Sequence, residues 1–171
     1  MNTIMNIAAI STPHGLGGIA VVRVSGPDAI ALVSKHFNPF NPKHILSDRP
    51  SHTLTFGQFL NASGEVLDEV VCSLYRGPHS FTGEDVIEIS CHGSVYIQQQ
   101  ILETLMGDDG LRWAEPGEFT RRAFAHGRLD LSQAEAVADL IASQNAAQHR
   151  IAMSQMKGSI SRQLDKLRDR S

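Results

Sequence analysis

With 171 residues, of which 42% are hydrophobic, and a net charge of −3, the chain can bury a core in one domain with an appendage. Residues 1–120 hold 6 Lys and Arg against 13 Asp and Glu, whereas residues 121–171 hold 9 against 5, so an acidic body carries a basic tail. We interpret the tail as a solvated helix rather than a nucleic-acid site, because nucleic-acid-binding domains are usually basic overall. The sequence contains neither a signal-peptide pattern nor a membrane-spanning apolar run, which predicts a cytoplasmic protein.

The first part of the chain predicts strands before any long helix. Residues 7–11 and 19–25 predict two strands separated by a glycine-rich turn. A helix follows to about His36, with Pro27 near its first turn, where a missing N–H costs nothing. Residues 37–52 predict a loop, because they hold three prolines among polar residues.

The middle of the chain adds further strands and one more helix. Residues 53–60 and 65–75 alternate loosely in polarity and predict a hairpin joined by a short polar turn. Residues 86–91 predict another strand, and residues 95–106 predict a helix. Because strands and helices mix without a regular βαβ repeat, the predicted fold class is α+β.

From residue 130 onward the apolar residues recur at near-helical spacing. They predict one long helix, or two helices joined near residues 157–159. Ser132 and Glu135 form a capping-box signature at its start. A long amphipathic helix needs cover for its apolar stripe. We therefore infer partner helices outside this sequence, or an oligomer.

Several chemistries lack the residues that they require. Residues 15–20 formally match a dinucleotide-binding glycine pattern, but that motif must open a helix, and strongly β-forming residues follow here. These glycines instead predict a tight turn or a close backbone approach to a ligand. There is no G-x-x-x-x-G-K-[ST] motif, so we expect no GTP hydrolysis by this chain alone. Cys72 and Cys91 lack metal-site spacing and predict buried free thiols rather than a metal site.

No catalytic residue is assigned from the sequence. His92 could act as a general base, but neither a nucleophile nor an orienting carboxylate stands beside it, which favours a structural histidine. Residues 83–85 lie at a loop-to-strand junction, where a structural role is favoured. Three arginines, Arg121, Arg122 and Arg128, flank a short helix and its exit, and form either a solvated basic face or an anion-recognition site.

Arg23 and Glu88 are the strongest candidates for a binding site. Each places a charge in an apolar strand run, where burial without a partner is costly. Two interpretations need no ligand: each charge faces solvent on an alternating strand, or the two residues pair. The third is a lined pocket. There a carboxylate could bind the adjacent N–H and NH₂ donors of a pterin or guanine edge, and an arginine could bind a ligand carbonyl or carboxylate.

Five motifs in a fixed order carry a resemblance to a known family. They lie at residues 7–13, 17–26, 80–93, 116–124 and 129–139. In this order they resemble the N-terminal, tetrahydrofolate-binding region of the MnmE (TrmE) family of tRNA-modification GTPases. The resemblance implies a domain over residues 1–120 similar to folate-binding aminomethyltransferases, followed over residues 121–171 by the first helices of a helical domain. The family's G domain, with its GTP, Mg and K, would be absent from this chain.

The resemblance also implies a function. It predicts binding of a reduced folate, formyl- or methylene-tetrahydrofolate, as one-carbon donor for an aminomethyl-type modification of the tRNA wobble uridine. It further implies homodimerisation through the N-terminal domain and a flavin- and NADH-dependent partner, MnmG. The family's folate contacts map onto Arg23, Glu88 and Arg128, although Arg128 stands where Lys is usual. The alternatives are a stand-alone folate-dependent one-carbon transferase and a non-catalytic scaffold for dimerisation.

Overall fold

The computed structural model describes residues 5–12 and 18–169, so the predicted glycine turn lies largely outside the described residues. The chain forms two compact units, Met1–Leu129 and Asp130–Ser171. The elements, in chain order, are β1 (Asn6–Ile10), β2 (Ile19–Ser25), α1 (Ala29–Ser34), β3 (Phe37–Pro39), the 3-10 turn η1 (Leu46–Asp48), β4 (Thr53–Leu60), β5 (Val66–Tyr75), β6 (Val86–His92), α2 (Val95–Met106), β7 (Leu111–Trp113), α3 (Glu118–Ala125) and α4 (Leu131–Asp169).

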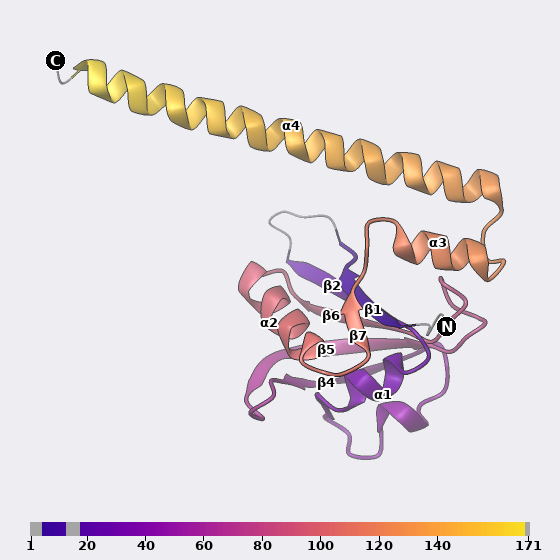
Figure 1. Cartoon of the computed structure of the whole chain (residues 1–171). Coiled ribbons are helices and arrows are strands. Elements are labelled where there is room, and N and C mark those ends of the chain that lie inside the picture. Colours follow the sequence, from indigo (N-terminus) through magenta and orange to yellow (C-terminus); the bar gives the residue numbers. More distant parts are fainter. Residues whose placement is uncertain (1–4, 13–17, 170–171) are drawn as a thin grey trace. The chain divides into compact units, whose positions relative to one another are not determined.

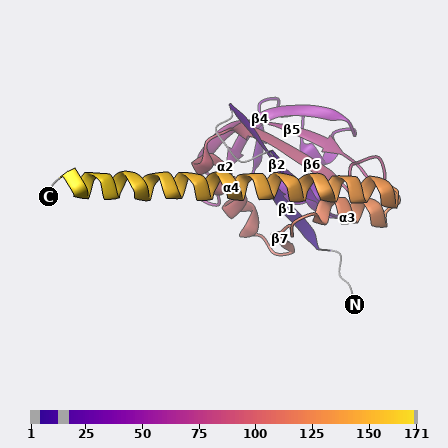
Figure 2. The same cartoon turned by 90° about the horizontal axis from the view of Figure 1, so that it is seen from above.

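The described part of the first unit is built on a seven-stranded sheet in the order β3-β4-β5-β6-β2-β1-β7. Figure 2 shows the sheet from β4 and β5 at one side to β1 and β7 at the other. The strands pair antiparallel except for β1 and β7, which are parallel. A mixed sheet with helices outside it confirms the predicted α+β class. The predicted loop over residues 37–52 instead contains β3 and η1, because residues 37–39 extend the edge of the sheet beside β4.

Along the central strands, buried residues alternate with more exposed ones, so successive side chains lie on opposite faces of the sheet. Ala20, Val22 and Val24 of β2 are at most 2% exposed and belong to the hydrophobic core. The buried residues of α1 and α2 belong to the same core, so both helices cover this face (Figure 1).

Cys72 and Cys91 are buried free thiols, as predicted. Burial raises the pKa of both, for Cys91 to about 11.

The opposite face of the sheet carries the residues between these positions, and we call it the α3 face. It includes Arg23 of β2, which lies directly opposite Glu88 of β6. Phe119 of α3 and Phe81 of the loop between β5 and β6 lie against Arg23, so α3 and this loop cover part of the face. We call residues 76–85 the β5–β6 loop.

The second unit is a single helix, α4, without a break at residues 157–159. Its N-terminal cap differs from the predicted one. Asp130 accepts a hydrogen bond from the Gln133 N–H at 2.8 Å, and the Gln133 side chain accepts one from the Asp130 N–H at 3.0 Å. Asp130 with Gln133 therefore forms the reciprocal cap that the sequence suggested for Ser132 with Glu135. No helix among the described residues is long and apolar enough to cross a membrane.

The division between the two units falls after Leu129, beyond the boundary at residue 120 that the sequence suggested. The reason is that α3 belongs to the first unit. Its Arg122 donates hydrogen bonds to Glu84 of the β5–β6 loop and to the backbone oxygen of Met5 before β1. The excess of acidic residues thus ends at residue 120, whereas the first unit continues through α3 to Leu129.

Candidate functional site

The centre of the α3 face is an ion pair between two neighbouring strands. Arg23 donates from Nε and Nη2 to Oε1 of Glu88, at 3.2 and 3.1 Å. The two side chains are 21% and 27% exposed, so the pair is largely withdrawn from solvent without being sealed from it. Of the ligand-free interpretations, mutual pairing is what the structure contains. Neither charge projects alone into bulk solvent.

Two aromatic rings hold the Arg23 guanidinium. Its central carbon lies 4.9 Å from the centroid of Phe81 and 5.2 Å from that of Phe119. Cation–π contacts of this kind are worth about 0.5–2 kcal/mol each, depending on desolvation. The rings belong to the β5–β6 loop and to α3, so two elements outside the sheet fix the direction of one strand residue. Neither phenylalanine was predicted as a site residue from the sequence, although each lies in one of the family motifs.

Arg128 joins this arrangement indirectly. Its Nε donates a hydrogen bond at 3.0 Å to the backbone oxygen of Ser80, the residue before Phe81. The structure therefore brings Arg23 and Glu88 into contact, and it places Arg128 at the loop that carries one of the rings over Arg23. Arg128 itself remains exposed.

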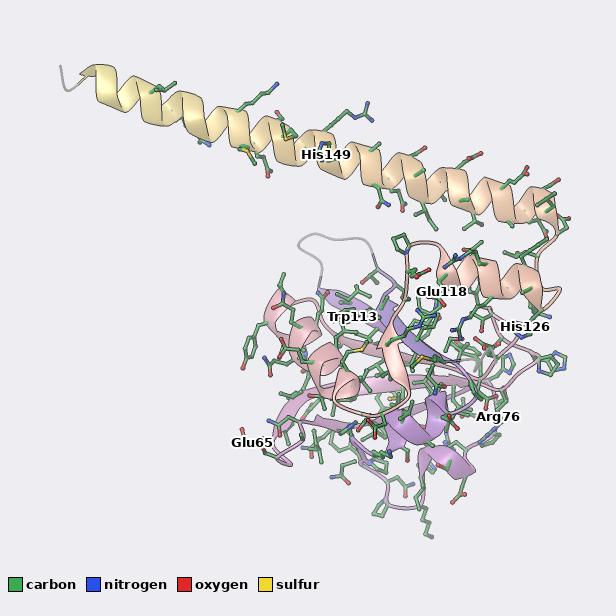
Figure 3. The ribbon with its side chains drawn as sticks, viewed as in Figure 1. Glu65, Arg76, Trp113, Glu118, His126 and His149 are labelled. Atoms are coloured by element: carbon green, nitrogen blue, oxygen red, sulfur yellow. The ribbon has the colours of Figure 1, made fainter. Side chains whose placement is uncertain are left out.

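A network of buried charges anchors α3 beside the site. Glu118, at the start of α3 (Figure 3), accepts two hydrogen bonds from Arg112 of β7, at 2.7 and 2.6 Å. The hydrogen bonds from Arg112, with a smaller contribution from the Glu115 backbone N–H and nearby positive charge, lower the pKa of Glu118 to about 2 in spite of its burial. Glu118 therefore remains ionised at neutral pH and ties α3 to the edge of the sheet.

Arg122 connects this network to the β5–β6 loop. Its guanidinium donates to Glu84 Oε1 at 2.9 Å and to Glu118 Oε2 at 3.2 Å, and its side chain is 13% exposed. Ser25 of β2 donates to the same Glu84 oxygen at 2.9 Å. The interpretation of Arg122 as part of a solvated basic face is therefore wrong, because two buried carboxylates surround it. Arg121 does face solvent, at 62% exposed.

These contacts make a single support for the Arg23–Glu88 pair. The network fixes α3, which carries Phe119, and the β5–β6 loop, which carries Phe81. The loop's own Glu84 has the structural role favoured from the sequence. The support is preformed, because its hydrogen bonds and ion pairs need no ligand to complete them.

Comparison with known proteins identifies the family. A family model for the GTP-binding protein TrmE N-terminus matches residues 6–128, and one for the MnmE helical domain matches residues 131–171. This chain belongs to the MnmE family. The two matched ranges meet where the structure divides into its two units. The resemblance inferred from the motifs is confirmed.

The relatives carry the same name throughout. The tRNA modification GTPase MnmE of Parabacteroides distasonis is 56% identical over 163 residues, and that of Bacteroides thetaiotaomicron is 55% identical over 164 residues. The matches cover 95% and 96% of this chain but 35% of each relative. The chain is therefore similar to the N-terminal third of these GTPases.

Proposed function

We propose that this chain is the folate-binding and dimerising N-terminal part of a tRNA-modification GTPase, with the Arg23–Glu88 pair as the centre of the binding site. The observation that carries the proposal is an ion pair on the sheet that still has unused hydrogen-bonding atoms. Both hydrogen bonds from Arg23 end on Glu88 Oε1, and Oε2 accepts none within the described part of the chain. The Nη1 group of Arg23 is likewise unused there.

These free atoms fit one edge of a reduced folate. The pterin ring presents adjacent N–H and NH₂ donors beside a carbonyl oxygen. A carboxylate accepts such donors in charge-assisted hydrogen bonds, and a guanidinium N–H donates to the carbonyl. Glu88 would accept through Oε2, sharing Oε1 with Arg23, while Nη1 of Arg23 would donate. A guanine edge has a similar donor pattern, so folate is preferred to guanine on the strength of the family.

Arg128 has a different part in the proposal. Its Nε is engaged with Ser80, but its two terminal NH₂ groups donate no hydrogen bond to the described residues. They would attract the negatively charged tail of a folate. An arginine can contact Ser80 and a ligand together, because its guanidinium has several separate N–H donors, whereas the lysine usual in the family has a single ammonium group.

The remaining functions belong to the full-length protein. There the reduced folate, as formyl- or methylene-tetrahydrofolate, would supply one carbon for an aminomethyl-type group on the wobble uridine of tRNA. A homodimer formed through the N-terminal domain would work with an MnmG-like flavoprotein in the cytoplasm. GTP, Mg and K would bind to the G domain of the longer protein.

Replacing Glu88 with glutamine tests the site. The change turns one acceptor oxygen into an NH₂ donor that faces the donors of the pterin edge. We expect binding to weaken by about 2–4 kcal/mol, from one lost charge-assisted hydrogen bond and one unpaired donor. Calorimetric titration with 5-formyl-tetrahydrofolate measures this. Glu103→Gln, on the exposed side of α2, is the matched control and should bind as the wild type does. Equal affinity of the two variants would place Glu88 outside the site.

A scaffold is the second candidate function, and α4 supplies the observation for it. Leu140, Ile151 and Met156 of this helix are 57–58% exposed. Sedimentation of residues 1–129 and of the whole chain separates the two possibilities. We expect both to sediment as dimers, because we assign dimerisation to the first unit. If only the whole chain associates, α4 carries the assembly instead.

A further inference from the structure

His92 has an orienting carboxylate that the sequence did not reveal. Its Nδ1 lies 2.7 Å from Asp68 Oδ1, and its backbone N–H donates to Asp68 Oδ2 at 2.8 Å. Asp68 belongs to β5 and His92 ends β6, and 24 positions separate them in the sequence. The structure therefore corrects the inference that no carboxylate stands beside His92.

The arrangement fixes the chemical state of the ring. A carboxylate at Nδ1 holds the proton on that nitrogen, so the neutral imidazole presents a free lone pair at Nε2. The Asp68 side chain is 10% exposed, whereas that of His92 is 72% exposed. Asp68 is thus the withdrawn, orienting member of the pair, and His92 is the accessible one. A histidine that accepts a hydrogen bond from a ligand at Nε2 is oriented in this way.

A cleft of about 180 Å³ opens beside His92 on the same strands. Ile19 and Val71 give it apolar walls, and Ser90, Glu69 and His92 give it polar groups. The carboxylate of Glu69 in this lining disfavours an anionic ligand group and favours a group that carries an N–H. The cleft therefore suits an apolar or aromatic ligand segment with an amine.

Ser90 relates the cleft to the face that carries the Arg23–Glu88 pair. Side chains alternate along a strand, so Glu88, Ser90 and His92 of β6 share one face. At about 3.3 Å per residue, His92 lies roughly 13 Å along the strand from Glu88. A ligand whose heterocycle binds at Glu88 could extend past Ser90 to the cleft.

We propose that His92, oriented by Asp68, accepts a hydrogen bond at Nε2 from an amine N–H of the ligand bound at Glu88. The inference rests on the proposed function and adds a specificity-determining residue to that site. The ligand nitrogen keeps its proton, and the Nδ1 proton of His92 stays hydrogen-bonded to Asp68. In the complex with neutral His92, the ligand amine N–H donates to Nε2.

The groups around His92 set the pH dependence. Among the described residues, Asp68 of β5 contacts the ring, and Glu69 of β5 and the uncharged Ile19 of β2 line the cleft beside it. Cys91 on β6 stays protonated, because burial and the charge of Asp68 raise its pKa to about 11. The group at the cleft whose positive charge would oppose an N–H donor is therefore the His92 ring.

The test is the affinity for 5-formyl-tetrahydrofolate as a function of pH. For the wild type we expect affinity to rise about tenfold from acidic to neutral pH, because the ligand N–H can donate only to a neutral Nε2. His92→Gln should bind without this rise, and the control His149→Gln on α4 should keep it. ¹⁵N NMR should show the Nδ1–H tautomer in the wild type and the opposite tautomer in Asp68→Asn, whose NH₂ group donates to Nδ1.

The outcomes separate the two proposals. If the wild type binds and His92→Gln keeps the same pH dependence, the role of His92 is wrong while the folate site stands. An Nε2–H tautomer in the wild type would also overturn it. If the wild type does not bind the folate at all, the proposed function fails, and this inference fails with it.

Discussion

Replacing Arg122 with methionine is expected to lower the free energy of unfolding by about 3–5 kcal/mol, the usual cost of removing one partner from a buried ion pair. The guanidinium lies between Glu84 and Glu118, whose side chains are each 7% exposed. Without it, the Glu84 carboxylate keeps only the hydrogen bond from Ser25, and a buried carboxylate remains without a cation. Denaturant unfolding measures the loss, and the fluorescence of Trp113, the one tryptophan of the sequence, reports on β7 beside this network.

The neighbouring arginine provides the control. Arg121 pairs with Glu115 at 2.7 Å, but their side chains are 62% and 65% exposed. Such surface pairs contribute about 0–1 kcal/mol, so Arg121→Met should unfold almost as the wild type does. Equal effects of the two substitutions would show that burial of the Arg122 network does not stabilise the fold.

Acid should destabilise the protein through Glu118. Its pKa is lowered from 4.5 to about 2 in the folded chain, chiefly by the hydrogen bonds from Arg112. A carboxyl whose folded pKa is depressed contributes stability above its unfolded pKa and loses it as the pH falls through the folded pKa. The contribution should therefore be complete above about pH 4.5 and should disappear towards pH 2, and it is on the order of 3 kcal/mol at 1.36 kcal/mol per pKa unit.

Unfolding measured between pH 2 and 6 checks this. The wild type should lose stability steeply across the window, and Glu118→Gln should start lower and change less. Glu103→Gln, which alters an exposed carboxyl of α2, should follow the wild type. A Glu118→Gln variant with the full wild-type slope would mean that other carboxyl groups control the acid response.

The sequence predicted most of the elements and the two strand charges, because these depend on local patterns. Runs of β-forming apolar residues over 19–25 and 86–91 identified β2 and β6, and a charge within an apolar run is visible without a structure. The near-helical spacing of apolar residues from residue 130 onward predicted α4. These patterns left the pairing of Arg23 with Glu88, 65 positions away, as one of several interpretations, since the register of two strands is set by the whole sheet.

The missed contacts have the same origin. Phe81 and Phe119 reach Arg23 from two different elements, and Asp68 meets His92 from a neighbouring strand. Arg122 appeared to be a solvated residue because its carboxylate partners, Glu84 and Glu118, come from a loop and from its own helix. The cap of α4 was predicted two residues too late, since Asp130 with Gln133 and Ser132 with Glu135 are both reasonable capping pairs, and only the helix start at Leu131 distinguishes them.

A structure determined with bound 5-formyl-tetrahydrofolate tests the central claim most directly. We predict the heterocycle on the α3 face, with its N–H edge within hydrogen-bond distance of Glu88 and its carbonyl oxygen near Arg23. A folate bound at another surface, with the Arg23–Glu88 pair unoccupied, would contradict the account.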